Sequence, residues 1–142
     1  MDALQTPDTG AIEADLADFF ATEAERLGIA AAYLFGSMAR GTTGSRSDVD
    51  VAVLYEGDPP SGFAGLGIPL AGDLERRLGR EVDVVVLNRA PVDLVHRVLR
   101  DGHLLIDRNR SRRIAFAVRA RNEYFDLLPH LLRYRRMERE RG

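Results

Sequence analysis

The sequence predicts a single α/β domain, because two kinds of segment alternate along it. Short apolar runs rich in β-branched residues are typical of buried strands, and longer segments with apolar residues at helical spacing are typical of amphipathic helices. The 142 residues suffice for one sheet with covering helices, and a chain that is 45% hydrophobic and 30% charged has an ordinary globular composition.

The helices are marked by their ends as well as by their periodicity. Three are expected before the last strand, over residues 12–27, 69–78 and 92–100. The first should end at Gly28, since glycine favours helix C-termini. A long last helix should be capped by Asp107. Pro129 should kink or break this helix, because its ring displaces the preceding turn and removes a hydrogen bond.

The strands are short and apolar. Four are expected, over residues 31–35, 49–54, 82–87 and 103–106. Asp83 lies within the third of these, and a charge inside an apolar strand requires a partner. Residues 56–67 contain two prolines and four glycines and are expected to form a loop.

A glycine–serine turn follows the first strand. Gly36 permits a close approach of the backbone to another group, and Ser37 stands where a helix N-cap is expected. Backbone N–H groups at such a turn face any anion placed against them. The turn therefore predicts a place for a phosphate.

Two carboxylates open the next strand. Asp48 and Asp50 are two residues apart, so both project to the same side of a strand. Their mutual repulsion is relieved by protonation, by an arginine or by a divalent cation, and carboxylates are ligands that suit Mg²⁺ or Mn²⁺. Each feature alone is common as a plain turn or a solvated strand end. Together they indicate phosphoryl or nucleotidyl transfer.

This arrangement resembles a known family. Gly36-Ser37, ten residues and Asp48-Val49-Asp50 resemble the Gly-Ser-x10-Asp-x-Asp signature of the polymerase-β-like nucleotidyltransferases. The fuller Gly-Ser-Met-Ala-Arg-Gly…Ser-Asp-Val-Asp-Val-Ala-Val is most similar to the minimal nucleotidyltransferases of bacteria and archaea. The resemblance implies a mixed, mostly antiparallel sheet with packed helices and a C-terminal helical extension.

The resemblance also implies the site residues. Asp48, Asp50 and Asp83 are expected to be catalytic and to hold Mg²⁺, with two ions expected and Mn²⁺ as an alternative, and ATP is the expected substrate. An ion pair of Asp83 with Arg80 or Arg89 is the competing interpretation of that residue. The expected nucleotide-binding residues are Gly36, Ser37, Arg40 and Ser47, although Arg40 is equally compatible with a plain surface position. The chain has no Walker loop, which excludes a P-loop ATPase.

Charge divides the chain in two. Residues 108–142 hold 11 arginines and 4 acidic residues, a net +7, whereas residues 1–107 hold 9 arginines and 18 acidic residues, a net −9. We expect a nucleotidyltransferase domain with an N-terminal helix over residues 1–107 and a helical extension over residues 108–142, within one globular unit.

The chain has no cysteine, which excludes disulfides and cysteine-ligated zinc. Without a signal peptide or a membrane-length apolar stretch, we expect a cytoplasmic protein with no membrane partner.

Members of the minimal nucleotidyltransferase family act as antitoxins that adenylylate a tyrosine of a HEPN ribonuclease toxin. The resemblance therefore implies a Mg²⁺-dependent protein adenylyltransferase whose partners are ATP and a HEPN toxin, as a homo-oligomer or a hetero-oligomer with that toxin. A small-molecule or tRNA nucleotidyltransferase and an antitoxin that acts by binding alone remain as alternatives. Nucleic acid is an unexpected direct substrate, because residues 133–141 carry one aromatic side chain and two interleaved glutamates.

One further pattern is discounted. Arg97 and His103 match the Arg-x4–6-His spacing of HEPN ribonucleases themselves, which requires both residues on one helix. Gly102 is expected to end the helix before the histidine, so we interpret the match as a coincidence.

Overall fold

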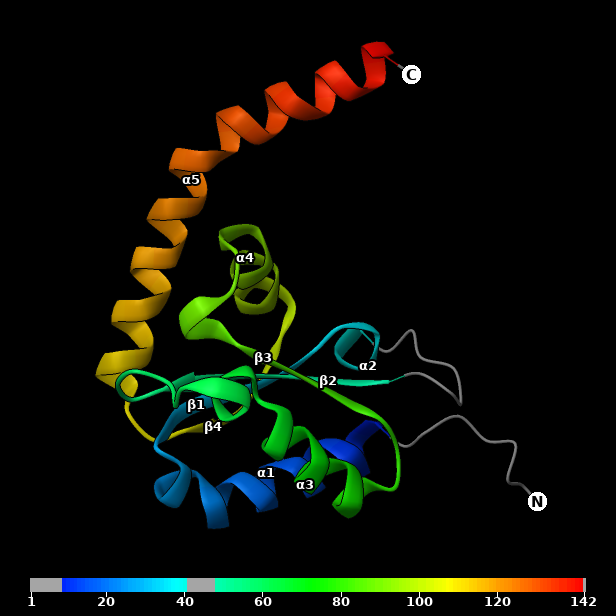
Figure 1. Ribbon diagram of the computed structural model, residues 1–142, viewed down its shortest axis with the longest axis vertical. Coiled ribbons are helices and arrows are strands. Elements are labelled where there is room, and N and C mark those ends of the chain that lie inside the picture. Colours follow the sequence, from blue (N-terminus) through cyan, green and yellow to red (C-terminus); the bar gives the residue numbers. More distant parts are fainter. Residues whose placement is uncertain (1–8, 41–47, 142) are drawn as a thin grey trace, which may run out of the picture.

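The computed structural model describes residues 9–40 and 48–141 and consists of one sheet with helices on both faces (Figure 1). The strands are β1 (Ile29–Phe35), β2 (Val49–Tyr55), β3 (Val82–Val86) and β4 (His103–Asp107). The α-helices are α1 (Thr9–Leu27), α2 (Ser37–Arg40), α3 (Ile68–Leu78), α4 (Val92–Asp101) and α5 (Arg110–Arg141). Two 3₁₀ helices, η1 (Gly62–Leu66) and η2 (Leu87–Arg89), complete the described elements.

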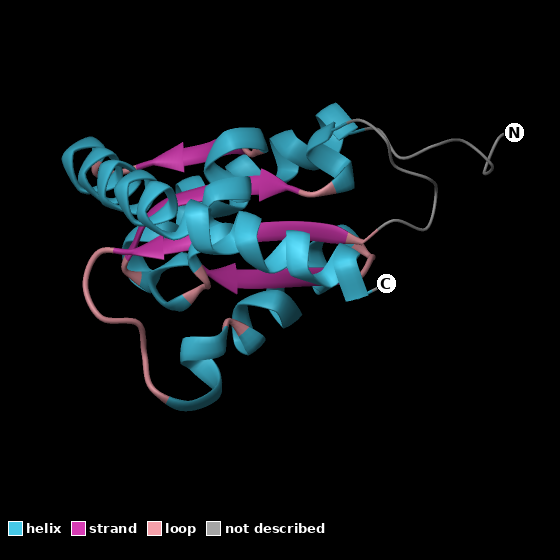
Figure 2. Ribbon diagram, turned by 90° about the horizontal axis from the view of Figure 1, so that it is seen from above, coloured by secondary structure: helices cyan, strands magenta, loops and turns pink. Residues whose placement is uncertain are grey.

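The sheet is mixed, with the strand order β3-β2-β1-β4 (Figure 2). β1 pairs antiparallel with both β2 and β4, and β3 adds parallel to β2. The parallel pair is possible because α3 lies between β2 and β3 in the chain and carries it back to the starting edge. The predicted mixed, mostly antiparallel sheet is confirmed.

The sheet separates two apolar layers (Figure 1). On one face, α1 and α3 pack their leucines and phenylalanines on alternate residues of β1 and β2, with Phe20 and Leu74 fully buried. On the other face, α4 and the first half of α5 cover Ala31, Ala52 and their neighbours. The face that α4 covers also carries the predicted carboxylate of Asp50, which alternates with Ala52 along β2.

The end of α5 leaves the body of the domain. Phe116 and Ala120 are its only buried residues, and Figure 1 shows the helix continuing past α4 into solvent. Pro129 lies inside α5, and of the two predicted outcomes, a kink or a break, the break does not occur, because the helix runs on to Arg141. Figure 1 shows that the axis of α5 changes direction along its length. A bend lets a helix accommodate the proline ring and the missing hydrogen bond without ending.

Two local predictions are wrong. Asp107 ends β4 instead of capping α5, and its carboxylate pairs with Arg113 at 2.8 Å. Asn109 takes the capping position, where its Oδ1 accepts a hydrogen bond from the backbone N–H of Arg112 at 3.0 Å. The predicted loop at 56–67 contains the short helix η1, which ends at Gly67 in a left-handed conformation with φ +81°.

None of the described helices is long and apolar enough to cross a membrane.

Candidate active site

The predicted site residues meet at one edge of the sheet because of the strand register. The end of β1 lies beside the start of β2, so Phe35 pairs with Asp50. Because β3 runs parallel to β2, its start lies at the same edge, and Asp83 pairs with Asp50 from the other side. The turn at Gly36 and both strand aspartates therefore converge, although 47 positions separate Gly36 from Asp83 in the sequence.

Asp50 and Asp83 belong to the face of the sheet that α4 covers. Asp50 alternates with Ala52, which packs in the α4 layer, and Asp48 precedes it by two residues. Asp83 alternates in the same way with Val85, which also packs against that layer. Asp48 and Asp83 are exposed and Asp50 is half-buried, so the cluster lies at the surface end of the strands rather than in the core.

The three carboxylates interact electrostatically. Burial, then the charge of Asp83 and then that of Asp48 raise the pKa of Asp50 above its ordinary value, and the charge of Arg40 opposes this shift. Of the two arginines in the competing interpretation of Asp83, Arg89 donates to the carbonyl of Pro59 at 3.4 Å. The cluster therefore carries an excess of negative charge that a cation would relieve.

The donor set fits a divalent cation in its chemistry. Carboxylate oxygens are the ligands that Mg²⁺ and Mn²⁺ take, and Asp50 is held half-buried between two others. Across residues 9–40 and 48–141, however, no three acidic or histidine side chains already form a closed ligand set. This agrees with the habit of Mg²⁺ to bind through one or two carboxylates together with waters and substrate phosphates.

Gly36 is a glycine because Asp50 lies against it. Its φ is +77°, and a Cβ built there would overlap Oδ2 of Asp50 and lie 3.1 Å from its Cγ. A side chain at this position would therefore displace the carboxylate as well as strain the backbone. The carbonyl of Gly36 accepts the first helical hydrogen bond of α2, from the N–H of Arg40 at 3.1 Å. Gly36 is thus the capping residue and Ser37 the first residue of the helix, which corrects the prediction that Ser37 caps it.

A cleft opens beside this turn, between α2 and α4. It has a volume of about 390 Å³, which lies in the range of small-molecule sites. The residues that line it are Phe35, Gly36, Ser37, Arg40, Asp50, Leu94, Arg97, Arg100 and Asp101. Four of the predicted site residues thus share one cleft. Ser47, also predicted to bind nucleotide, lies outside the described residues.

No sequence pattern indicated that α4 contributes to this cleft. Arg97 and Arg100, one turn apart, both line it. Arg100 is already paired with Asp101, donating from Nε and Nη2 at 2.9 Å each, and this pairing raises the pKa of Arg100 and lowers that of Asp101. Arg97 has no hydrogen bond or ion pair with any residue that the structure describes. Its guanidinium is therefore available to an anion in the cleft.

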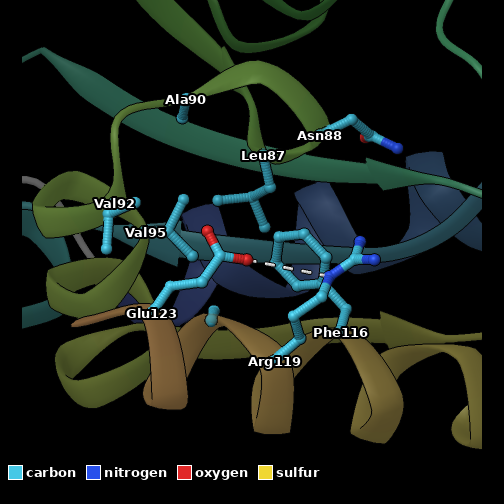
Figure 3. Close-up of a pocket in the computed structure, with 9 residues that line it drawn as sticks. Leu87, Asn88, Ala90, Val92, Val95, Phe116, Arg119 and Glu123 are labelled. Atoms are coloured by element: carbon cyan, nitrogen blue, oxygen red, sulfur yellow. Dashed lines mark ion pairs between the residues drawn. The ribbon is translucent and has the colours of Figure 1, made fainter. Parts of the chain in front are cut away.

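A different hollow lies away from the predicted site residues (Figure 3). Leu87, Val95 and Phe116 form its apolar walls, and Arg119 faces Glu123 at 3.8 Å on α5 beside it. Its volume of about 100 Å³ is too small for a nucleotide. Of the two hollows, the cleft between α2 and α4 is the one that combines a suitable size with carboxylates and arginines.

Comparison with known proteins agrees with this geometry. Residues 16–111 match the family "Polymerase beta, Nucleotidyltransferase", a span that includes the Gly36 turn and all three aspartates. No curated protein matches the chain.

Several solved structures share the fold over most of the chain. A chain of a toxin–antitoxin complex with AMP-PNP superposes with a TM-score of 0.72 at 26% identity, covering 89% of this chain and 98% of that one. A chain of an MntA–HepT complex superposes with a TM-score of 0.68 at 24% identity, covering 90% and 97%. A chain of the tri-AMPylated HEPN toxin of Shewanella oneidensis in complex with its MNT antitoxin superposes with a TM-score of 0.70 at 23% identity, covering 92% and 99%. With the family match spanning residues 16–111, the chain belongs to the polymerase-β nucleotidyltransferase family.

Proposed function

We propose that this protein is an antitoxin that transfers AMP from ATP to a tyrosine of a HEPN toxin. The observation that carries the proposal is the meeting of the Gly36 turn with Asp48, Asp50 and Asp83 at one edge of the sheet. The similar chain found with AMP-PNP supports ATP as the donor. The complex with a tri-AMPylated HEPN toxin supports a protein acceptor, since the fold matches over nearly the whole of both chains.

The cleft between α2 and α4 is the proposed donor site. The backbone at Gly36 can approach a phosphate closely, and the Ser37 hydroxyl can donate to it. Arg40 and Arg97 would contribute positive charge from the two walls, and Ser47 is proposed to bind the nucleotide as well. The site therefore places phosphate-binding groups directly beside the half-buried carboxylate of Asp50.

The carboxylates are proposed to hold Mg²⁺ or Mn²⁺, which would neutralise charge on the triphosphate when bound. In the transfer, the tyrosine oxygen forms a bond to the α-phosphorus, the bond from that phosphorus to the bridging oxygen breaks, and pyrophosphate leaves. Asp83 is proposed to take the phenolic proton or to contribute to the metal site, and its position beside Asp50 at an exposed end of β3 supports this role. The protein supplies positioning and charge, which dominate catalysis of such transfers.

Two forms of labelled ATP test the reaction type. The purified protein is incubated with Mg²⁺ and a HEPN protein, using ATP labelled at the α- or the γ-phosphate. Adenylyl transfer predicts label on the HEPN protein from α-labelled ATP alone, and none with Asp48→Asn. Label from γ-labelled ATP would show phosphoryl transfer, and label on an RNA or a small molecule with the HEPN protein unmodified would show a different acceptor.

A further inference from the structure

A groove lies on the far side of α4 from the donor cleft, between α4 and α5. We name it the α4–α5 groove, and it is lined by His96, Leu99, Arg100, Ala117, Arg121 and Phe125. It encloses about 260 Å³, and Leu99, Ala117 and Phe125 give it an apolar surface. Phe125 is 51% exposed, which is unusual for a large aromatic side chain with a role in the core alone.

The groove is built on ordered side chains. The rings of His96 and Tyr124 stack at 3.6 Å between centroids and join α4 to α5. Phe125 packs edge-on against Tyr124 at 5.9 Å, and the Arg121 guanidinium lies 5.6 Å from the Phe125 ring. The exposed aromatic is therefore held in place before anything binds, which reduces the entropy lost on association.

The groove adjoins the donor cleft. Arg100 lines both the groove and the donor cleft, so α4 forms the wall between the two. The exposed side of α4 lies between their openings. Figure 1 shows α5 continuing past α4, so a body resting on α4 would contact α5 as well. A polypeptide seated in the groove would lie one helix width from the site where AMP is transferred.

Charge indicates what this occupant is. No acidic side chain lines the groove, and of its two arginines Arg100 is paired with Asp101, so Arg121 supplies the positive charge that faces an occupant. A symmetric pairing of two copies through this groove is disfavoured, because residues 108–142 carry a net +7 and would face the same segment of the other copy. An acidic segment of another protein, with an apolar side chain to cover Phe125, matches both the charge and the apolar surface.

We propose that the α4–α5 groove docks an acidic, apolar-anchored segment of the acceptor protein and so presents its hydroxyl to the donor cleft. This inference rests on the proposed function, because it assumes a protein acceptor. The groove selects the acceptor and leaves the donor site unchanged. The groove residues Phe125 and Arg121, which do not line the donor cleft, therefore affect the KM for the acceptor protein and not the affinity for ATP.

The test compares Phe125→Ala with Ile114→Ala, which removes a 41% exposed apolar side chain from α5 outside the groove. We expect Phe125→Ala to raise the KM for the HEPN protein by roughly tenfold or more, as for a buried aromatic anchor at an interface. Arg121→Glu should raise it as well, Ile114→Ala should leave it within twofold, and calorimetry should give the same ATP affinity for all.

The outcomes separate the two claims. If the wild-type protein modifies no HEPN protein, the proposed function fails. If it does and Phe125→Ala keeps the wild-type KM, or if Ile114→Ala raises it equally, the groove is not the docking site. A loss of ATP affinity in Phe125→Ala would also overturn the inference, because the groove would then serve the donor. Melting curves verify that each variant is folded, as expected for exposed positions.

Discussion

The pair Gly36→Ala and Gly28→Ala separates backbone strain from damage to the site. Both glycines have left-handed backbones, with φ +77° and +73°. A Cβ at Gly28 would meet nothing within 4 Å, whereas one at Gly36 would overlap the carboxylate of Asp50. Both substitutions therefore strain the backbone. Only Gly36→Ala also displaces the carboxylate of Asp50.

The magnitudes follow from this difference. An alanine in the left-handed region costs about 1–2 kcal/mol. For a chain of 142 residues this lowers the melting temperature by about 3–10 °C. Gly28→Ala should show this loss with normal transfer activity below its melting temperature. In Gly36→Ala the Asp50 carboxylate must rotate away, and a displacement of about 1 Å at a reacting site lowers the rate by roughly 100-fold.

The assay measures thermal melting and the rate of AMP transfer for both variants at a temperature where both are folded. We expect two destabilised proteins of which Gly36→Ala alone is inactive. Equal activities would refute the reasoning, because they would show that the Gly36–Asp50 contact does not matter to the site. An inactive Gly28→Ala that is still folded would refute it as well.

Three further predictions concern the same edge of the sheet. In EDTA, Asp50→Asn should melt higher than wild type although it is inactive, because the raised pKa of Asp50 means that ionising it destabilises the fold. The gain in melting temperature should be absent at acidic pH, where Asp50 and the substituted asparagine are both neutral, and should grow as pH rises through the raised pKa of Asp50. Melting curves over a pH series that show no such growth would contradict this prediction. Arg97→Ala should weaken Mg²⁺–ATP binding by about tenfold or more in calorimetry. Arg100→Ala should weaken it less, because the guanidinium of Arg100 is already paired with Asp101. Equal losses of affinity in the two variants would exclude a special role for Arg97. ATP should raise the melting temperature strongly with Mg²⁺ and little in EDTA, and equal shifts would exclude metal-linked binding.

The sequence was most informative where local patterns decide the structure. Two local patterns predicted that carboxylates gather at one edge of the sheet, namely the period-2 spacing of Asp48 and Asp50 and the β-branched run around Asp83. Strand alternation and pairing need little tertiary context, which is why these patterns were sufficient. Gly36 was likewise predictable as a close-approach position. Its contact, Asp50, follows from the register alone.

The remaining features depend on packing that no local pattern encodes. Arg97 and Arg100 line the cleft because of the way α4 lies across the sheet, which its sequence does not specify. Asn109 caps α5 in place of Asp107, because Asp107 extends β4 and pairs with Arg113. This ion pair outweighs the propensity of aspartate to cap a helix. Pro129 lies within α5 without ending it, and a proline inside a helix is commonly accommodated by a bend.

The most direct test of the account is intact-mass and peptide mass spectrometry of the HEPN protein co-expressed with this chain. The wild-type chain should leave AMP on a tyrosine of the HEPN protein, and the Asp48→Asn, Asp50→Asn double variant should leave it unmodified while still folding. A double variant that protects cells as well as wild type would show that binding suffices for neutralisation. An unmodified HEPN protein in the presence of the wild-type chain would contradict the central claim.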